Sequence, residues 1–276
     1  MSNDPTATPP PPEPLRNARF SAQPGLAAVL AGQPALGSGS RGPAVKAVQQ
    51  ALVDMGFSVP GGVDGSFGAQ SGKALRNFQM HAHAAFPQVD TTGVVDAPTL
   101  RALDALAPAP GQKGQTGHLP VPSYQGTPVR VVVVKNEHRT FLFDAQGQVQ
   151  GIYGNAVGRG KTPTDPGLKK VTGKLNEAES HALGMKLWGS WAFGSRLVDL
   201  SWDTGKTSGE ELHGTNAPNQ LGEDVSHGCV RHANADIEVI WKVLKVGDKV
   251  AIVERVDDPN LGSPKAPAPP SSGGVA

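Results

Sequence analysis

The chain has 276 residues, enough for two domains, a formal net charge of +1 and a single cysteine, Cys229. This charge provides no long-range attraction to nucleic acid or to an anionic membrane, and one cysteine excludes an intramolecular disulfide framework. No run of about 18 apolar residues occurs in the sequence, so no membrane span is expected.

Proline and glycine divide the chain into compact and extended parts. Residues 1–37 are rich in Pro, Ala and Ser and predict a disordered lead-in, without the basic and apolar regions of a secretory signal peptide. Residues 107–127 predict a Pro/Gly linker, and residues 257–276 a disordered tail of similar composition. The compact segments are therefore residues 38–106 and 128–256.

The segment 38–106 predicts three short helices separated by glycine-rich turns. In each helix, apolar side chains recur at a spacing that puts them on one face: Val45, Val48 and Leu52; Leu75 and Phe78; and Leu100, Leu103 and Leu106. Asp96 precedes the third helix, where its side chain can cap the first turn.

The segment 128–256 begins with alternating branched and aromatic residues, a pattern typical of strands, with hairpin turns at NEHR and DAQGQ. Further strands are expected around Leu187–Trp191 and Arg196–Leu200. A helix capped by Asn234 is expected from about Ala235, because helical spacing recurs at Ile237, Ile240, Trp241 and Leu244. A last strand follows in KVGDKVAIVE, which predicts a mainly β domain with one prominent helix.

Cys229 stands in the polar stretch SHGCVRH, in the loop just before that helix. A thiol becomes a nucleophile when a base or a positive charge favours its thiolate. Gly228 leaves room beside the sulfur, neighbouring backbone amides could form an oxyanion hole, and Arg231 could bind a carboxylate. Three histidines are candidate bases: His213, His227 and His232.

Two other interpretations of Cys229 remain open at this point. It could be a buried structural residue, or it could ligate zinc together with His213, His227 and His232. The close spacing of His227 and Cys229 is unfavourable for two zinc ligands, so no metal is expected.

The stretch HGTNAPNQLGEDVSHGCVRHANADIEVIW resembles the signature of the L,D-transpeptidase catalytic domain of the YkuD type. GRGKTPTDPGLKKVTGK upstream and VLKVGDKVAIVE downstream also resemble this family, although an Asp interrupts the usual Thr-Pro in the first of them. The resemblance covers residues 128–256. It implies a β-sandwich or barrel-like catalytic domain that uses no cofactor.

The resemblance also implies a role for each matching residue. Cys229 would be the nucleophile and His213 the base that activates it, oriented by a backbone carbonyl such as that of Gly214. His227 would line the site, and Gly228 with the Cys229 amide would form the oxyanion hole. Substrate binding or the shape of the site is implied for Arg231, Ser226 and Thr215.

The activity implied is that of a cysteine-dependent L,D-transpeptidase acting on peptidoglycan stem tetrapeptides. An acyl-enzyme thioester would lead to 3→3 crosslinking or to D-amino acid exchange. The alternatives are an L,D-carboxypeptidase, a secreted effector that damages a wall with the same site, and a catalytically inert peptidoglycan-binding protein. A Cys-His wall amidase is disfavoured, because in the common enzymes of that kind the Cys precedes the His.

The first compact segment resembles the three-helix peptidoglycan-binding domain in GSRGPAVKAVQQALVDMGF, VDGSFGAQSGKALRNFQ and TGVVDAPTLRAL. Its groove is expected at the turn Asp64–Phe67 and the second helix. Phe78 is expected in the core, and His81 and His83 at the surface. Peptidoglycan is the expected partner, and nucleic acid is not.

Trp188 and Trp191 could wall the substrate groove or pack in the core, and His232 is expected to be solvent-facing or structural. The substrate implies a periplasmic or cell-wall location. Without a recognisable signal peptide, the sequence predicts non-classical export, such as a contractile injection machine, or a start site that omits the leader.

Overall fold

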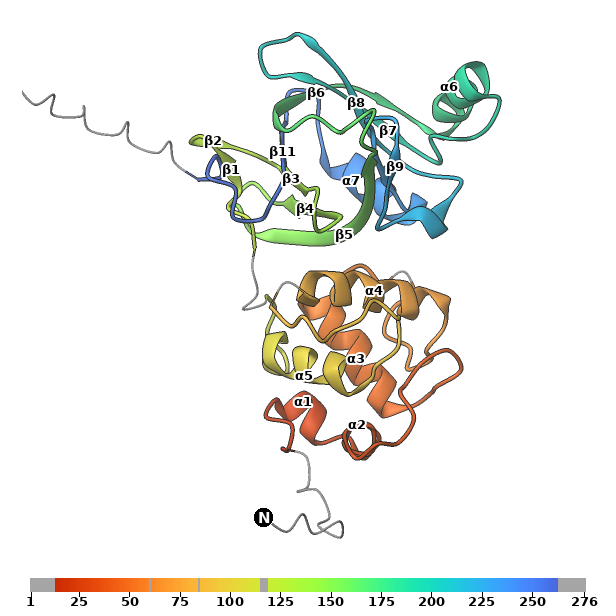
Figure 1. Cartoon of the computed structure of the whole chain (residues 1–276), viewed down its shortest axis with the longest axis vertical. Coiled ribbons are helices and arrows are strands. Elements are labelled where there is room, and N and C mark those ends of the chain that lie inside the picture. The colour runs from red at the N-terminus through yellow and green to blue at the C-terminus, as the bar shows by residue number, and fades with distance from the viewer. Residues whose placement is uncertain (1–12, 60, 84, 115–118, 263–276) are drawn as a thin grey trace, which may run out of the picture. The chain divides into compact units, whose positions relative to one another are not determined.

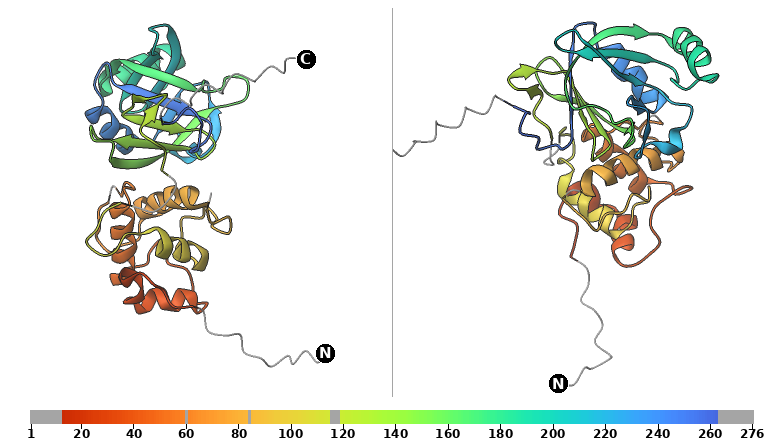
Figure 2. Two further views of the ribbon diagram at one scale, coloured as in Figure 1. Left: turned by 90° about the vertical axis from the view of Figure 1, so that its left-hand side faces the viewer. Right: turned by 45° about the horizontal axis from the view of Figure 1, so that its top comes forward.

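The computed structural model describes residues 13–59, 61–83, 85–114 and 119–262. The chain forms two compact units (Figures 1 and 2), here called the helical unit, Met1–Gly117 with Gly151–Tyr153, and the β unit, His118–Gln150 with Gly154–Ala276. None of the helices in the described ranges combines the length and the apolar character that crossing a bilayer demands.

The helical unit is built from α1 (Ala18–Ser21), α2 (Pro24–Leu30), α3 (Pro43–Asp54), α4 (Ala69–His83) and α5 (Ala97–Leu106). The last three of these are the helices that the sequence predicts. Their apolar faces meet in one core, in which Leu75, Phe78 and Leu100 have no exposed surface. Asp96 caps α5 as predicted, since its carboxylate accepts from the Thr99 N–H at 2.9 Å.

Part of the expected disordered lead-in is folded, so that prediction is wrong for α1 and α2. These two helices contact α3 and bury Phe20, Leu26 and Val29. A nearly buried ion pair joins Arg19 to Asp54 at 2.7 Å. The proline-rich composition of the first residues makes the apolar spacing of this segment hard to recognise in the sequence. Residues 1–12 lie outside the described part of the chain.

Two buried glutamines hold the glycine turns of the helical unit. The Gln49 side chain donates to Asp64 Oδ1 at 2.9 Å and accepts from the Gly65 N–H at 2.8 Å. Gln79 repeats the arrangement and accepts from the Gly93 N–H at 2.7 Å. Gly65 and Gly93 have φ of 75° and 77°, a conformation that favours glycine, so each turn depends on both residues.

The two neighbouring histidines of α4 differ in exposure. His81 is buried with its ring 5.7 Å from that of Phe57, so the expectation that it is exposed is wrong. His83 is exposed as expected, and its Nδ1 lies 2.9 Å from the carbonyl oxygen of Val89. Histidine is intermediate between the buried and the exposed residue types, so the residue type alone does not predict whether a histidine is exposed.

The strands of the β unit are β1 (Ser123–Tyr124), β2 (Thr127–Pro128), β3 (Val131–Val134), β4 (Arg139–Phe143), β5 (Val149–Gly158), β6 (Gly167–Leu175), β7 (Leu197–Trp202), β8 (Thr207–His213), β9 (Asp224–Ser226), β10 (Val230–His232) and β11 (Lys249–Val253). Nine of them form one sheet in the order β10-β8-β7-β6-β11-β3-β4-β5-β9. Because β10 also pairs with β5, the sheet curls back on itself into a barrel-like shape (Figure 1). The prominent helix, α7 (Asn234–Val243), lies against β7 and β8.

A second helix replaces an expected strand. Residues around Leu187–Trp191 were expected to be extended, but α6 spans Glu177–Trp188. Asn176 and Glu179 form a reciprocal capping box at its start, and Gly189 ends it with φ of 63°. These local signals favour a helix, so the strand expected there is wrong.

The predicted linker and tail are partly ordered as well. β1 and β2 pair within the segment expected to be a linker, and Tyr124 forms a bridge with Leu261 of the expected tail. Residues 115–118 and 263–276 lie outside the described ranges.

Candidate active site

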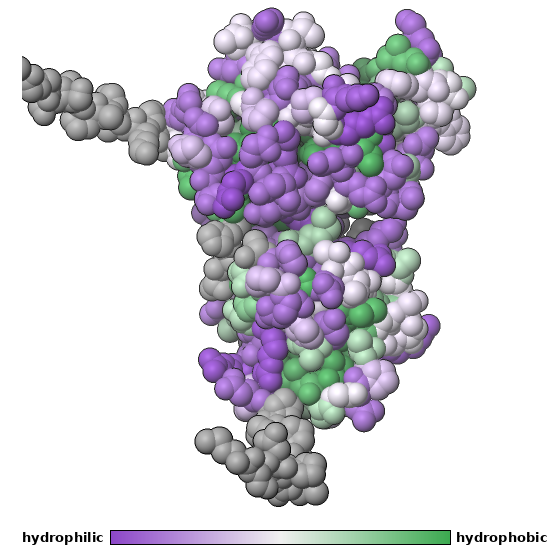
Figure 3. All heavy atoms as spheres, viewed as in Figure 1, coloured by the Kyte–Doolittle hydropathy of each residue, from purple (hydrophilic) through white to green (hydrophobic). Residues whose placement is uncertain are grey.

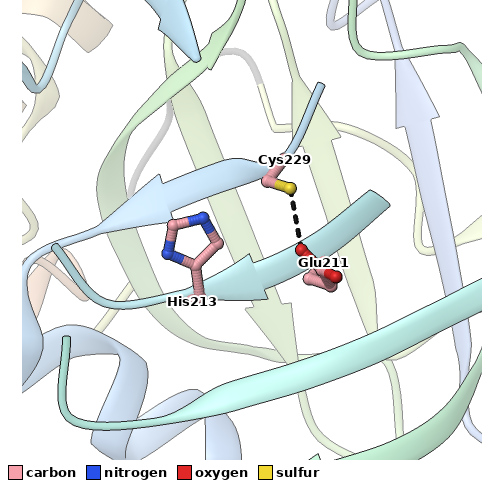
Figure 4. Close-up of side chains that lie close together, drawn as sticks. All are labelled: Glu211, His213 and Cys229. Atoms are coloured by element: carbon pink, nitrogen blue, oxygen red, sulfur yellow. Dashed lines mark hydrogen bonds between the residues drawn. The ribbon is translucent and has the colours of Figure 1, made fainter. Parts of the chain in front are cut away.

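The site is built on two adjacent parallel strands. The register of β8 and β10 pairs Leu212 with Val230 and His213 with Arg231. Because side chains alternate along a strand, Leu212 and Val230 point into the core, where both are fully buried. Glu211 and His213 therefore share the other face with Cys229, as Figure 4 shows.

The Cys229 thiol points at a carboxylate that the sequence analysis did not select. Sγ donates to Glu211 Oε2 at 2.8 Å (Figure 4). Burial and the adjacent Glu211 charge raise the pKa of the thiol. Burial likewise raises the pKa of Glu211. The missed signal is its position two residues before His213 on the same strand, which places both side chains on one face.

His213 is held in one tautomer. Its Nδ1 lies 2.5 Å from the Gly214 carbonyl oxygen, which can only accept, so Nδ1 carries the hydrogen and Nε2 has the free lone pair. The edge of the ring meets Phe193 at a centroid distance of 5.0 Å. Burial lowers the pKa of His213 to about 4, so the ring is neutral at neutral pH. It is placed to accept a proton rather than to supply a standing positive charge.

The loop before Cys229 is held by two hydroxyl groups. Ser226 Oγ donates to the Cys229 carbonyl at 2.5 Å and accepts from the Gly228 N–H at 3.1 Å. Thr164, which the sequence analysis did not select, donates to the Gly228 carbonyl at 2.7 Å. Gly228 has φ of 118°, which favours glycine. Since its N–H is directed at Ser226, the expected oxyanion hole would have to share that donor.

Thr215 and Arg231 shape the surroundings of the pair. The Thr215 N–H donates to Asn234 Oδ1 at 3.0 Å, so Asn234 braces this turn instead of capping α7 as predicted. Arg231 is half-buried, and its guanidinium donates to Gln220 Oε1 at 3.2 Å. It lies one strand position beyond Val230, on the same face as Cys229.

The other two histidines of the motif do not join the thiol. His227 is exposed, with Nε2 2.8 Å from Arg159 Nη2 and its ring 5.5 Å from that of Trp188. His232 is fully buried and lies 2.8 Å from Thr140 Oγ1, so it is structural, one of its two expected alternatives. Trp188 is 55 % exposed, which excludes core packing for it.

The four-ligand zinc hypothesis is wrong in this geometry, because only His213 and Cys229 of its members come together. Among the described residues, the group with ligand spacing is Glu211, His213 and Cys229, whose donor atoms lie within 4.8 Å of one another. One sulfur, one nitrogen and one oxygen could bind a cation in principle. Two of these ligand atoms, the sulfur and the oxygen, are already joined by the thiol–carboxylate hydrogen bond.

A separate hollow of about 400 Å³ lies within the helical unit. It is formed by the glycine turn at Asp64 and the start of α4, the place where the sequence predicts a groove. Its polar lining includes Ser40, Arg41, Gln49, Asp64, Ser66 and Gln70. Figure 3 shows the hydropathy of one face of each unit, with polar and apolar residues interspersed.

Known proteins resemble both units. The family model described as the L,D-transpeptidase catalytic domain matches residues 128–252, and the model described as "Putative peptidoglycan binding domain" matches residues 41–103. "Putative L,D-transpeptidase YqjB" of Bacillus subtilis is 28% identical over 142 residues, which cover 50% of this chain and 76% of that protein.

A solved structure supports the fold. The crystal structure of an L,D-transpeptidase from Xylanimonas cellulosilytica matches with a TM-score of 0.57 at 22% identity, covering 80% of this chain and 98% of that chain. The predicted fold class, a helical domain followed by a barrel-like β domain, is confirmed.

Proposed function

Because residues 128–252 form a domain of the L,D-transpeptidase catalytic family, we propose that this enzyme acts through Cys229 on peptidoglycan stem tetrapeptides. One observation carries the proposal. The base candidate His213 on β8 and the nucleophile candidate Cys229 just before β10 come together, with a ring nitrogen and the sulfur within 4.8 Å. The sheet register sets the spacing of the pair, and the Ser226 and Thr164 hydroxyls hold the loop that carries Cys229.

The first half-reaction is acyl transfer to sulfur. The thiol proton passes to His213 Nε2 as the proposed base, and Sγ attacks the carbonyl carbon before the terminal D-alanine. The C–N bond breaks, the leaving amine takes the proton from His213, and a thioester remains on Cys229. The backbone N–H of Cys229 would donate to the developing oxyanion, and that of Gly228 would do so only by sharing its hydrogen bond to Ser226 Oγ.

The second half-reaction decides the product. An amine of another stem gives a 3→3 crosslink, a D-amino acid gives exchange, and water gives a trimmed stem. Arg231 lies on the same face as Cys229 and suits a substrate carboxylate, because a guanidinium can bind one through two parallel hydrogen bonds.

The helical unit would hold the wall while the β unit reacts with it. Residues 41–103 match a peptidoglycan-binding domain, and the polar hollow beside Asp64 is the natural binding place on it. Hydroxyl, amide and guanidinium groups there suit a ligand rich in sugar and peptide polar groups. Domains of these two kinds suggest a cell-wall or periplasmic location.

Intact-protein mass spectrometry tests the proposal. The full chain is incubated with a purified disaccharide-tetrapeptide, and wild type is compared with Cys229→Ala and Cys229→Ser. We expect a covalent adduct on the wild type, with loss of D-alanine from the peptide, and none on the alanine variant.

A chelator arm belongs to the same experiment. Adduct formation should be unaffected by EDTA, because the proposed chemistry uses only protein groups. An adduct on Cys229→Ala would assign the nucleophile elsewhere. A wild type that binds the peptide without any adduct would favour the inert peptidoglycan-binding alternative.

A further inference from the structure

Glu211 is the hydrogen-bond partner of the reactive thiol, and the proposed function does not use it. Its Oε2 lies 2.8 Å from Cys229 Sγ, and its side chain is half-buried, so solvent and substrate can reach it. Whatever binds covalently to Sγ therefore has a carboxylate as its immediate neighbour.

The negative charge beside the sulfur is poorly neutralised. Asp199 of β7 lies directly across from Glu211 of β8 on the same face of the sheet. Like charges in such a cross-strand pair repel each other. Within the described residues neither carboxylate belongs to an ion pair, whereas the next carboxylate, Glu210, is paired with the buried Lys169 at 3.0 Å.

The other groups around Glu211 do not change this balance. His213, two residues along β8, is buried, and burial keeps its ring neutral. Arg231 on β10 pairs with His213 in the strand register, not with Glu211, and donates to Gln220. Burial also raises the pKa of Asp199, which is the expected response of a carboxylate that no cation stabilises.

We propose that Glu211 is a third catalytic residue, which holds the ammonium group of the acyl acceptor beside the Cys229 thioester and takes its proton. This inference rests on the proposed function, because the acceptor must approach the carbonyl that is bonded to Sγ. A protonated amine cannot attack, so a base at this point turns a bound cation into a nucleophile. The Glu211 carboxylate attracts a cationic acceptor but not a neutral water molecule. Glu211 therefore favours transfer to the amine over hydrolysis.

The step balances in atoms and charge. The ammonium group gives one proton to the Glu211 carboxylate, and the free amine attacks the thioester carbonyl carbon. The new C–N bond forms as the C–S bond breaks, and the second proton from the nitrogen returns to sulfur as the thiol. Glu211 then releases its proton to water.

Acceptor choice in the full chain tests this role. Wild type, Glu211→Gln, Glu211→Asp and the exposed control Glu223→Gln are acylated with the disaccharide-tetrapeptide. Each acyl-enzyme is offered a D-amino acid, whose amine is protonated at neutral pH, or hydroxylamine, which is uncharged. Mass spectrometry gives the ratio of transfer product to hydrolysed tripeptide for each acceptor.

We expect Glu211→Gln to lower the ratio for the D-amino acid by about tenfold or more and to leave that for hydroxylamine within about twofold. Glu211→Asp should retain an intermediate ratio, and Glu223→Gln should match wild type. If the Gln variant forms no adduct, the Asp variant provides the same comparison.

Unchanged ratios would overturn the inference, and so would an equal loss for both acceptors, which a purely structural role predicts. A wild type that forms no adduct would instead contradict the proposed function itself, and is seen before any variant is compared.

Discussion

Two regions of the β unit approach the candidate site in different ways. Glu211 and His213 lie on β8, and Cys229 directly precedes its parallel neighbour β10, so sheet hydrogen bonds and a buried core help to fix their positions. α6 is capped locally at both ends, and Trp188 at its end and Trp191 in the loop after it are exposed. The difference separates chemistry, which needs fixed atoms, from substrate contact, which tolerates adjustment.

Replacing His213 should give the largest effect apart from loss of Cys229. His213→Gln keeps a polar side chain but removes the free Nε2 lone pair, so we expect the rate of adduct formation to fall by about 10² to 10⁴. His181→Gln, on α6, is the matched control and should acylate at nearly the wild-type rate. Mass spectrometry of samples quenched at timed intervals measures the rate of Cys229 adduct formation for both variants.

A mild effect of His213→Gln would break the comparison in an informative way. Acylation would then depend on another base, and Glu211, which already accepts the thiol hydrogen bond, would be the group to replace next. The same group of residues would still carry out the reaction, with Glu211 in place of His213 as the base.

The buried histidines of the strand pair should also set how stability depends on pH. Burial lowers the pKa of His213 to about 4 and that of His232 to about 3, both below the unfolded value of about 6.5. The unfolded chain therefore binds more protons below about pH 6.5. The free energy of unfolding should fall as the pH drops from there toward the folded pKa values.

His232→Gln tests that linkage. Each buried histidine contributes about 1.4 kcal/mol per pH unit to the slope of the free energy of unfolding against pH in this range. The slope for His232→Gln should therefore be smaller by about that amount. Urea titrations followed by tryptophan fluorescence measure it for the β unit alone, because the four tryptophans, at 188, 191, 202 and 241, all lie there. His83→Gln, in the helical unit, is the control. An unchanged slope would mean that His232 is not held neutral.

The sequence predicts the elements whose signals are local. The spacing of Val45, Val48 and Leu52 predicts α3, whereas the pairing of His213 with Cys229 is implied by the resemblance to a known family and not by spacing. The helical signal depends on a spacing that by itself places the side chains on one face.

Glu211 and Thr164 could not be found in that way. Glu211 becomes important only through the register that sets β8 beside β10, and Thr164 through a contact with Gly228 across 64 residues. At the Asp that interrupts the family stretch, the Asp165 backbone N–H donates to Glu210 at 3.1 Å, a contact across 45 residues. Long-range partners of this kind are properties of the sheet topology and leave no periodic trace in the sequence.

The smallest expected effect concerns the exposed aromatic side chains near the cysteine loop. Trp188 contacts His227, two residues before Cys229, whereas Trp191 stacks on His181 at 4.5 Å, within the α6 region. We expect Trp188→Ala to raise KM for the tetrapeptide substrate by about three- to tenfold with little change in kcat, the loss of about 1 kcal/mol of stacking. Trp191→Ala should stay within about twofold.

Steady-state rates with the disaccharide-tetrapeptide separate the two variants. Equal rises in KM would mean that the substrate contacts α6 as one apolar surface, and no rise in either would remove α6 from substrate binding. A rise for Trp188 alone would place the contact beside the cysteine loop. A fall in kcat for Trp188→Ala would contradict the separation of chemistry from substrate contact. The exposed ring of Trp188 would then help to position the reactive atoms at β8 and β10.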